Sequence, residues 1–169
     1  MKKLTLWPAM SIATVTFMFA TGFTLHNEID SSVSWISMEQ AQEKSAEDGK
    51  PLFVFVEAEW CGICKRMLAN VFPNQDVSDD LMANYHPVKI DLDSKNQIRF
   101  NGETMTEREF AREMIVAGTP TTIFFDSAGD ELGRQVGFVS IEDLQQLLAY
   151  VVSDQFNEVS FEEFQSEGR

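Results

Sequence analysis

Short apolar runs along the chain predict the strands of a sheet. Residues 52–56 are five consecutive apolar side chains, a length and composition typical of a strand buried on both faces. Residues 88–92 alternate apolar and polar positions, and residues 121–125 are rich in Thr, Ile and Phe, so both ranges also predict strands. A Gly-containing turn over 126–130 leads into residues 131–136, which would complete a hairpin.

Helices are predicted between and after these strands. Ser37 with Gln40, and Thr106 with Glu109, form capping-box patterns that open two of them. After Ser140, apolar residues recur on one helical face. The expected helices span 38–48, 62–71, 76–84 with Asp76 as the cap, 107–115, and a last range after Ser140, while the polar stretch 94–104 is expected to be a loop.

The N-terminal residues follow a different pattern. Lys2 and Lys3 precede a stretch to Leu25 without a charged side chain, and its densest apolar part lies at 9–20. This is typical of a bacterial secretory signal, with cleavage after Gly22. An uncleaved membrane anchor is the alternative, because about 20 apolar residues can span a bilayer. In both cases the rest of the chain is expected in the periplasm.

The chain divides into four expected parts. Residues 1–22 are the signal peptide or anchor, 23–36 a tether, 37–153 the folded domain, and 154–169 an acidic tail with a short amphipathic helix. Within the domain the order of elements is βαβ, then a β-hairpin, then a helix. This order predicts an α/β fold with a central mixed sheet and helices on both faces. We expect the protein to be a monomer.

The charge of the chain narrows the choice of partners. It has 27 acidic and 13 basic residues and a formal net charge of −14. The sequence has no basic patch of the kind that neutralises phosphates, so a nucleic-acid partner is excluded. The acidic side chains are expected to form a solvated surface.

Cys61 and Cys64 are the only cysteines. A structural zinc site needs four Cys or His ligands, and only His26 and His86 could add to these two. A purely structural disulfide would close a very small loop and would remove little entropy from the unfolded chain. The sequence therefore favours a redox pair over a metal site or a staple, and we expect no metal and no cofactor.

The position of the two cysteines explains how such a pair would react. They follow a buried strand and open a helix, where free backbone N–H groups stabilise a thiolate. Cys61 would be the exposed nucleophile, and Cys64, one turn deeper, would resolve a mixed disulfide. Gly62 would let a partner chain approach closely, Trp60 would cover the rim of the site, and Lys65 would add positive charge near the helix start.

These residues resemble the thioredoxin family over about residues 37–152. The similarity rests on two stretches, Trp60-Cys61-Gly62-Ile63-Cys64-Lys65 and Gly118-Thr119-Pro120-Thr121. It implies the thioredoxin fold and dithiol–disulfide exchange through a redox-active Cys61–Cys64 disulfide. It also implies that Pro120 is cis and faces the disulfide, and that Thr119 offers backbone groups to an incoming peptide.

A narrower similarity, to SoxW-type periplasmic thioredoxins, rests on further short stretches. These are Lys50–Phe53, Asn101–Glu109, Phe124–Asp126, Gly137–Phe138, Tyr150–Val151 and Ser160–Phe164. The similarity implies a reductase of disulfide-containing periplasmic proteins, with a sulfur-carrier protein as one candidate. Electrons would come from a membrane thiol transporter of the DsbD or CcdA kind, and the C-terminal thioredoxin-like domain of DsbD is a more distant relative.

Two departures from the family bear on the mechanism. Ordinary thioredoxins have a buried Asp six residues before the first Cys, and here that position is Phe55. Residues two apart on a strand share a face, so we hypothesise that Glu57 replaces that Asp as proton acceptor for Cys64. The alternative is that Glu57 is an ordinary solvated carboxylate. Ile63 stands where strongly oxidising relatives often have His, which favours a reductase with a potential of about −270 to −200 mV.

Two other functions stay open at this point. A disulfide oxidase or isomerase would use the same cysteines and would differ in its reduction potential. A non-catalytic thioredoxin-fold binding or assembly factor would keep its function after loss of Cys61.

Overall fold

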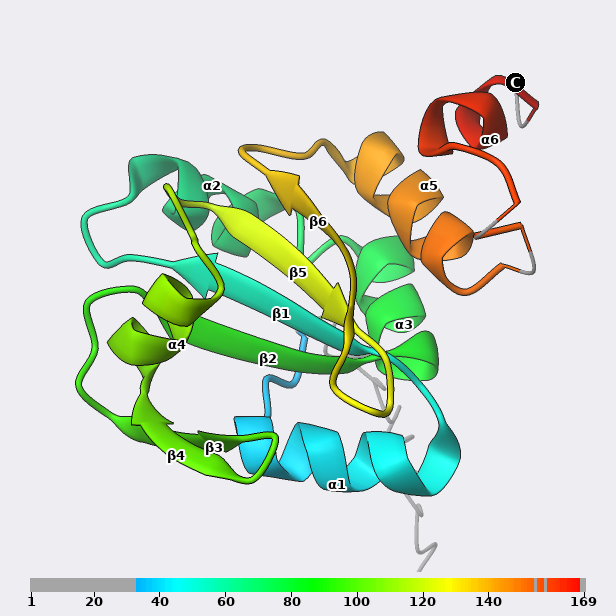
Figure 1. Cartoon of the computed structure of the whole chain (residues 1–169). Helices are drawn as coiled ribbons and strands as arrows, with labels where there is room; N and C mark the ends of the chain where they lie inside the picture. The colour runs from blue at the N-terminus through cyan, green and yellow to red at the C-terminus, as the bar shows by residue number, and fades with distance from the viewer. Residues whose placement is uncertain (1–32, 154, 157, 168–169) are drawn as a thin grey trace, which may run out of the picture.

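The computed structural model describes residues 33–153, 155–156 and 158–167 (Figure 1). The expectations for residues 1–32, which include the signal peptide or anchor, lie outside this part. The helices are α1 (Met38–Asp48), α2 (Gly62–Asn70), α3 (Gln75–Asn84), α4 (Glu107–Glu113), α5 (Ile141–Val151) and α6 (Phe161–Glu167). The strands are β1 (Leu52–Glu57), β2 (His86–Asp91), β3 (Gln97–Phe100), β4 (Glu103–Thr106), β5 (Thr121–Phe125) and β6 (Glu131–Val136).

A four-stranded mixed sheet forms the centre of the molecule, in the order β2-β1-β5-β6. β1 and β2 are parallel, and β5 runs antiparallel to both β1 and β6. Helices α2, α3 and α5 cover one face, and α1, α4 and the β3–β4 hairpin cover the other (Figure 1). The predicted mixed sheet with helices on both faces is confirmed. Within the described ranges, every helix is too short or too polar to cross a membrane.

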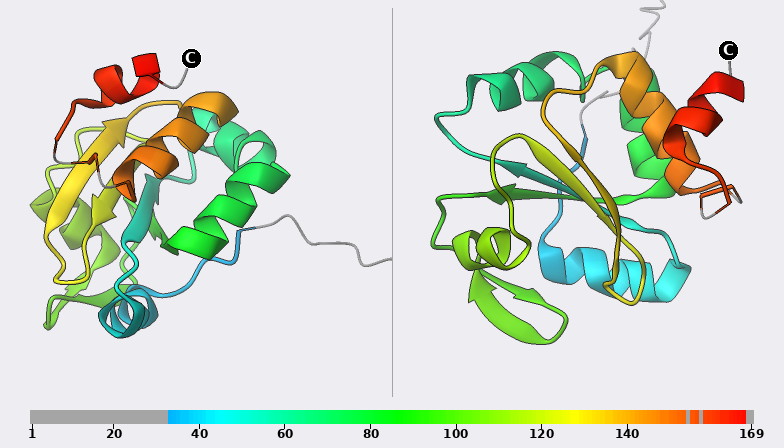
Figure 2. Two further views of the ribbon diagram at one scale, coloured as in Figure 1. Left: turned by 90° about the vertical axis from the view of Figure 1, so that its right-hand side faces the viewer. Right: turned by 45° about the horizontal axis from the view of Figure 1, so that its top comes forward.

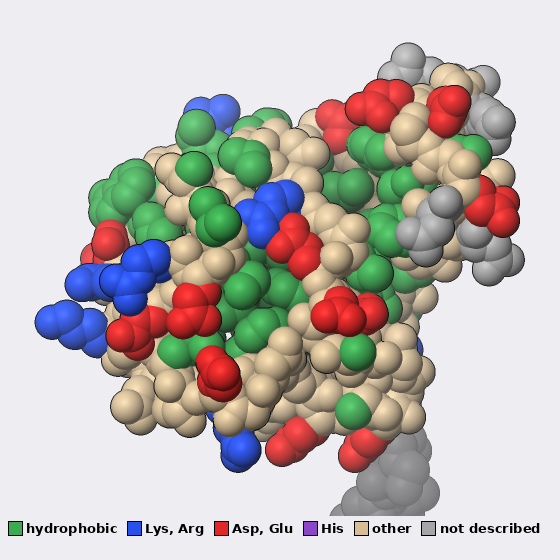
Figure 3. Space-filling model, in the orientation of Figure 1, with side chains coloured by type: hydrophobic (Ala, Val, Ile, Leu, Met, Phe, Trp, Pro, Cys, Tyr) green, Lys and Arg blue, Asp and Glu red, His purple; other side chains and the backbone are tan. Residues whose placement is uncertain are grey.

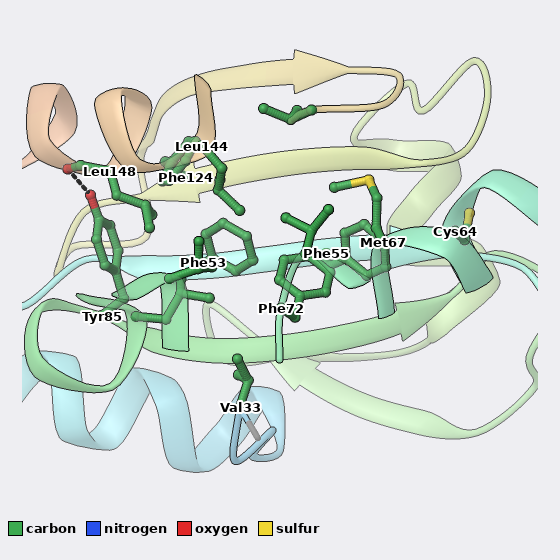
Figure 4. Close-up of a cluster of buried hydrophobic side chains, with 14 of the residues drawn as sticks. Val33, Phe53, Phe55, Cys64, Met67, Phe72, Tyr85, Phe124, Leu144 and Leu148 are labelled. Carbon is green, nitrogen blue, oxygen red and sulfur yellow. Dashed lines mark hydrogen bonds between the residues drawn. The ribbon is translucent and has the colours of Figure 1, made fainter. Parts of the chain in front are cut away.

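Strand β1 divides its side chains between two cores. Val54 and Val56 pack toward α1 and α4, whereas Phe53 and Phe55 belong to an aromatic core that extends to Cys64 (Figure 4). Because all four side chains are fully buried, β1 is the two-sided central strand that its continuous apolar run predicted. The cysteines thus follow the most rigidly packed strand of the sheet.

The domain begins before the residue we expected. Val33 is 7% exposed and belongs to the aromatic core, and the ring of Trp35 lies 5.2 Å from that of Phe72. Ile36 forms a β-bridge with Val88 and donates its N–H to the Pro87 carbonyl at 3.0 Å. Residues 33–36, which we assigned to the tether, therefore belong to the folded domain.

The prediction of a loop at 94–104 is wrong, because this segment contains the β3–β4 hairpin. Asn101 and Gly102 form its two-residue turn, with φ angles of 49° and 85°. An Asn-Gly pair adopts these positive angles readily and is a strong hairpin signal. Ile98 and Phe100 are buried against α1 and α4, so the polar residues between them occupy the outer face of a short two-stranded sheet.

The helix starts follow their side-chain caps. Both capping boxes are present, at Ser37 in α1 and at Thr106 in α4, as predicted. The predicted cap of α3 is wrong: Asn74 accepts the N–H groups of Asp76 and Val77 at 3.1 and 3.2 Å, so the helix starts at Gln75. Asn is as good an N-cap as Asp, and the earlier residue takes the position.

The C-terminal helix α6 lies beside α5 in both views of Figure 2. The rings of Phe156, Phe161 and Phe164 lie 5.2 to 5.5 Å from that of Tyr150 on α5. The Tyr150 hydroxyl also lies 2.8 Å from the Phe156 carbonyl and 2.7 Å from the Val159 carbonyl. Tyr150 is therefore the anchor of the tail.

Candidate functional site

Cys61 and Cys64 lie at the start of α2, four residues after the end of β1. Cys61 is the N-cap of the helix, and its N–H donates to the Ala58 carbonyl at 2.9 Å, which closes the turn after the strand. The two cysteines form a disulfide. A helix N-terminus favours negative charge, so reduction of this bond would leave the Cys61 sulfur where a thiolate is stabilised.

The two sulfurs differ in their surroundings. Cys61 is 4% exposed and Cys64 is fully buried, so only Cys61 is open to a partner, and through a narrow window. The backbone N–H of Cys64 lies 3.0 Å from the Cys61 sulfur and donates to it. This donor would stabilise the thiolate form of Cys61 and would position it for attack.

The rim of the site is apolar and exposed. Trp60 is 68% exposed and Ile63 is 44% exposed. A Cβ placed at Gly62 would meet no atom within 4 Å, so this edge of the disulfide is open. Lys65 is also exposed, one residue after Cys64. The Trp60 indole N–H donates to the Asp93 carboxylate at 2.7 Å, so the indole is held in place although its surface faces solvent.

Sequence reasoning missed the role of Asp93, which we placed among the solvated carboxylates. Asp93 lies 33 positions from Trp60 in the chain, and no local motif links them. The contact arises because β1 and β2 are parallel neighbours, so the loops after both strands meet at the same edge of the sheet. Asp93 is a positioning residue for the rim of the site.

The Thr119–Pro120 peptide bond is cis and lies at the same edge. Thr121, the next residue, pairs with Val56 near the end of β1, and the Pro120 carbonyl accepts the N–H of Gly137 at 2.8 Å. The Thr119 hydroxyl oxygen is buried and makes no hydrogen bond among the described residues. The fold therefore places this loop at the end of the sheet where the cysteines lie.

Glu57 is the last residue of β1 and points to the same side of the sheet as Phe55. Its carboxylate lies 3.9 Å from the Lys89 ammonium, and Lys89 is the register partner of Phe55 on the parallel strand β2. Burial raises the pKa of Glu57 above its ordinary value of 4.5, while Lys89 and Lys65 oppose this rise. Glu57 is thus a partly buried carboxylate at the edge of the sheet where the cysteines lie.

Phe55 fills the space where ordinary thioredoxins have a carboxylate. It is fully buried, and its ring packs edge-to-face on Phe72 with the centroids 4.9 Å apart. Both rings belong to the same core as Cys64 and Met67 (Figure 4). The inner side of the disulfide is therefore apolar at this position, and Glu57 is the nearby carboxylate that the same strand supplies.

Comparisons with known proteins give a consistent picture. A family model described as a thioredoxin-like domain matches residues 38–152. The chain is 27% identical over 108 residues to the disulfide bond reductase DsbH of Chlamydia pneumoniae, covering 63% of this chain and 64% of that protein. It is 33% identical over 106 residues to the thiol:disulfide interchange protein DsbD of Actinobacillus pleuropneumoniae, covering 61% of this chain and 17% of that protein. The chain thus spans less than two thirds of either relative.

Solved structures agree with this assignment. A thioredoxin from Thermus thermophilus has a TM-score of 0.60 and 26% identity, covering 75% of this chain and 91% of that chain. A thioredoxin-fold protein from Helicobacter pylori has a TM-score of 0.64 and covers 84% of this chain and 89% of that chain. At 14% identity, this second likeness shows the fold alone. Since the family model covers most of the chain, the protein belongs to the thioredoxin-like domain family and has the thioredoxin fold.

Proposed function

We propose that this protein is an exported thiol-disulfide oxidoreductase that reduces disulfides of periplasmic partner proteins. The observation that carries the proposal is the Cys61 sulfur at the N-terminus of α2, 3.0 Å from the Cys64 N–H. An open rim and the Thr119–Pro120 loop lie beside it. This arrangement activates one sulfur, shields the other and leaves room for a peptide. The relatives named DsbH and DsbD support the same chemistry.

The reaction would proceed in two exchanges. In the dithiol form, the Cys61 thiolate attacks one sulfur of the partner disulfide, and the other partner sulfur leaves as a thiolate that takes up a proton. Cys64 then loses its proton and attacks the Cys61 sulfur, which breaks the mixed disulfide and releases the second partner thiol. Two electrons pass to the partner, and the Cys61–Cys64 disulfide remains.

The direction, the compartment and the partners are parts of the same proposal. The signal-like residues 1–22 support export to the periplasm. Ile63 between the cysteines supports the reducing direction, since it cannot stabilise the Cys61 thiolate as a His would. The SoxW-type similarity supports a membrane thiol donor of the DsbD or CcdA kind and a sulfur-carrier protein as one candidate partner.

The reduction potential of the Cys61–Cys64 couple tests the direction. We expect a value of about −270 to −200 mV, measured by equilibration in dithiothreitol and glutathione buffers followed by thiol alkylation. A value near about −120 mV would instead identify a strong oxidant. In that case the protein would be a disulfide oxidase, and the fold would be shared with reductases without their direction of electron flow.

We further propose that Glu57 accepts the proton of Cys64 during the second exchange. Replacing Glu57 with Gln should slow resolution of the mixed disulfide about 10²-fold near neutral pH, a typical loss for a general base. The raised pKa of Glu57 means that the carboxylate becomes a base only as the pH rises above its ordinary 4.5. The wild-type resolution rate should therefore increase with pH through that window, as stopped-flow fluorescence of a mixed disulfide would measure.

The matched control is Glu59→Gln, since Glu59 is two residues away and exposed. Glu59→Gln should leave the resolution rate unchanged, and Glu57→Gln should lack the pH dependence above 4.5. Stability supplies a second readout. A raised folded-state pKa favours the protonated form, so the wild type gains stability relative to Glu57→Gln as the pH falls through this window. Identical pH–rate profiles for all three proteins would refute the role of Glu57.

A further inference from the structure

A groove of about 390 Å³ adjoins the redox site and has no part in the chemistry above. It is lined by Leu92, Asp93, Arg108, Arg112, Ile115, Val116 and Ala117. Leu92 and Asp93 follow β2, at the edge of the sheet where β1 ends, and the Leu92 N–H donates to the Glu57 carbonyl at 2.8 Å. Ala117 precedes Thr119 and the cis bond by two residues. A partner segment beside Cys61 could therefore extend into this groove.

The floor of the groove is an unusual apolar segment. Ile115 is 81% exposed and has a φ angle of 52°. A β-branched residue in the left-handed region is strained, and such strain is concentrated at binding and catalytic sites. Val116 and Leu92 beside it are half-buried. An exposed, fixed Ile together with these side chains provides an apolar contact for a partner residue.

The backbone next to this floor is available for pairing. Among the described residues, no hydrogen bond uses the N–H or carbonyl of Ala117 or Thr119. An extended peptide can pair with such groups in the manner of an added strand. This pairing would direct the residues that flank the partner's cysteine along 117–119 toward the groove.

The charge of the groove is opposite to that of the chain as a whole. Its one carboxylate, Asp93, is already bound by the Trp60 indole N–H. Arg108 is held by a hydrogen bond to the Asp93 carbonyl at 2.6 Å, and Arg112 lies 3.9 Å from Glu109 with both side chains largely in solvent. Figure 3 shows Lys and Arg side chains gathered at the left, near α4 and the loops after β1 and β2, whereas acidic side chains cover α6. The groove thus offers two guanidinium groups in a chain of net charge −14.

We propose that this groove selects partner proteins that carry acidic side chains a few residues from the reactive cysteine. The carboxylates would contact Arg108 and Arg112, and an apolar neighbour would contact Ile115. Local charge complementarity of this kind determines which partner binds more than how tightly it binds. The inference rests on the proposed reductase function and adds a substrate preference to it.

Peptides of one sequence test the preference. Each is acetylated, amidated and activated at its single Cys as a 2-pyridyl disulfide, and the residues flanking Cys are Glu, Gln or Lys. The Cys61 thiolate attacks the peptide sulfur and releases 2-thiopyridone, and Cys64 then frees the peptide thiol as the Cys61–Cys64 disulfide forms. At low ionic strength we expect the Glu peptide to react about fivefold faster than the Gln peptide, and the Lys peptide more slowly, as exposed charge pairs allow.

Variants assign the preference to the groove. Arg112→Glu should reverse the order of the Glu and Lys peptides, and the Arg108→Gln, Arg112→Gln double variant should remove it, with the rate for the Gln peptide unchanged within about twofold. Arg99→Gln is the matched control, because Arg99 is exposed on β3 and does not line the groove. The preference should also fade as salt rises toward about 1 M.

The outcomes separate this inference from the proposed function. A wild type that reduces the Glu, Gln and Lys peptides at equal rates would overturn the groove preference and leave the reductase function standing. So would a preference that persists unchanged in Arg112→Glu. A wild type that reduces none of the peptides would overturn the proposed function and this inference with it.

Discussion

Replacing Cys61 with Ser is expected to abolish disulfide reduction, with a rate loss on the order of 10³-fold or more. The Cys61 sulfur receives the Cys64 N–H at the start of α2, and a Ser hydroxyl at the same place is far too weak an acid to become a nucleophile there. Cys64 cannot take over the attack because it is fully buried. The measurement is the rate of insulin reduction with dithiothreitol as electron donor, compared with the uncatalysed rate.

Cys64→Ser is the informative partner of this variant. It keeps the Cys61 nucleophile, so it should attack a disulfide once and then accumulate as a mixed disulfide, visible by non-reducing electrophoresis or mass spectrometry. Cys61→Ser should form no such species. A binding or assembly factor with idle cysteines would behave differently, because both variants would keep its function. Wild-type turnover in Cys61→Ser would refute the oxidoreductase proposal.

The parts of the fold that the sequence predicts are those with local causes. The run 52–56 predicts a two-sided strand because only the centre of a sheet accepts five apolar residues in succession. The caps at Ser37 and Thr106 predict helix starts because the same few residues supply both hydrogen bonds. The two cysteines predict their own site because they lie between that strand and the helix that follows it.

Other features depend on contacts between distant residues. The Trp60–Asp93 hydrogen bond and the groove beside it exist only because two parallel strands end at the same edge. The β3–β4 hairpin is a different case, since its Asn101-Gly102 turn is a local signal. The polar composition of 94–104 outweighed that signal, although Ile98 and Phe100 alternate as a half-buried strand requires.

Replacing Phe55 with Asp is expected to lower the free energy of unfolding by about 4 kcal/mol or more. Removing a buried Phe ring costs about 3–5 kcal/mol through lost contacts and a cavity. Phe55 is fully buried, with its ring 4.9 Å from Phe72. An Asp side chain would also lose its hydration there, so its pKa would rise and the loss would grow with pH above about 4. Guanidinium unfolding of the oxidised protein at pH 5 and pH 8 measures both effects.

Phe55→Leu is the matched control, since it keeps an apolar side chain of similar volume. It should cost about 1–2 kcal/mol and show no added dependence on pH. The comparison decides how this chain departs from ordinary thioredoxins, which place a carboxylate at the same position. If Phe55→Asp were as stable as Phe55→Leu and resolved mixed disulfides faster, the apolar core would be no obstacle to that carboxylate. If it is strongly destabilised, the aromatic core has closed this route, and a proton leaving Cys64 must pass to a group outside that core, such as Glu57.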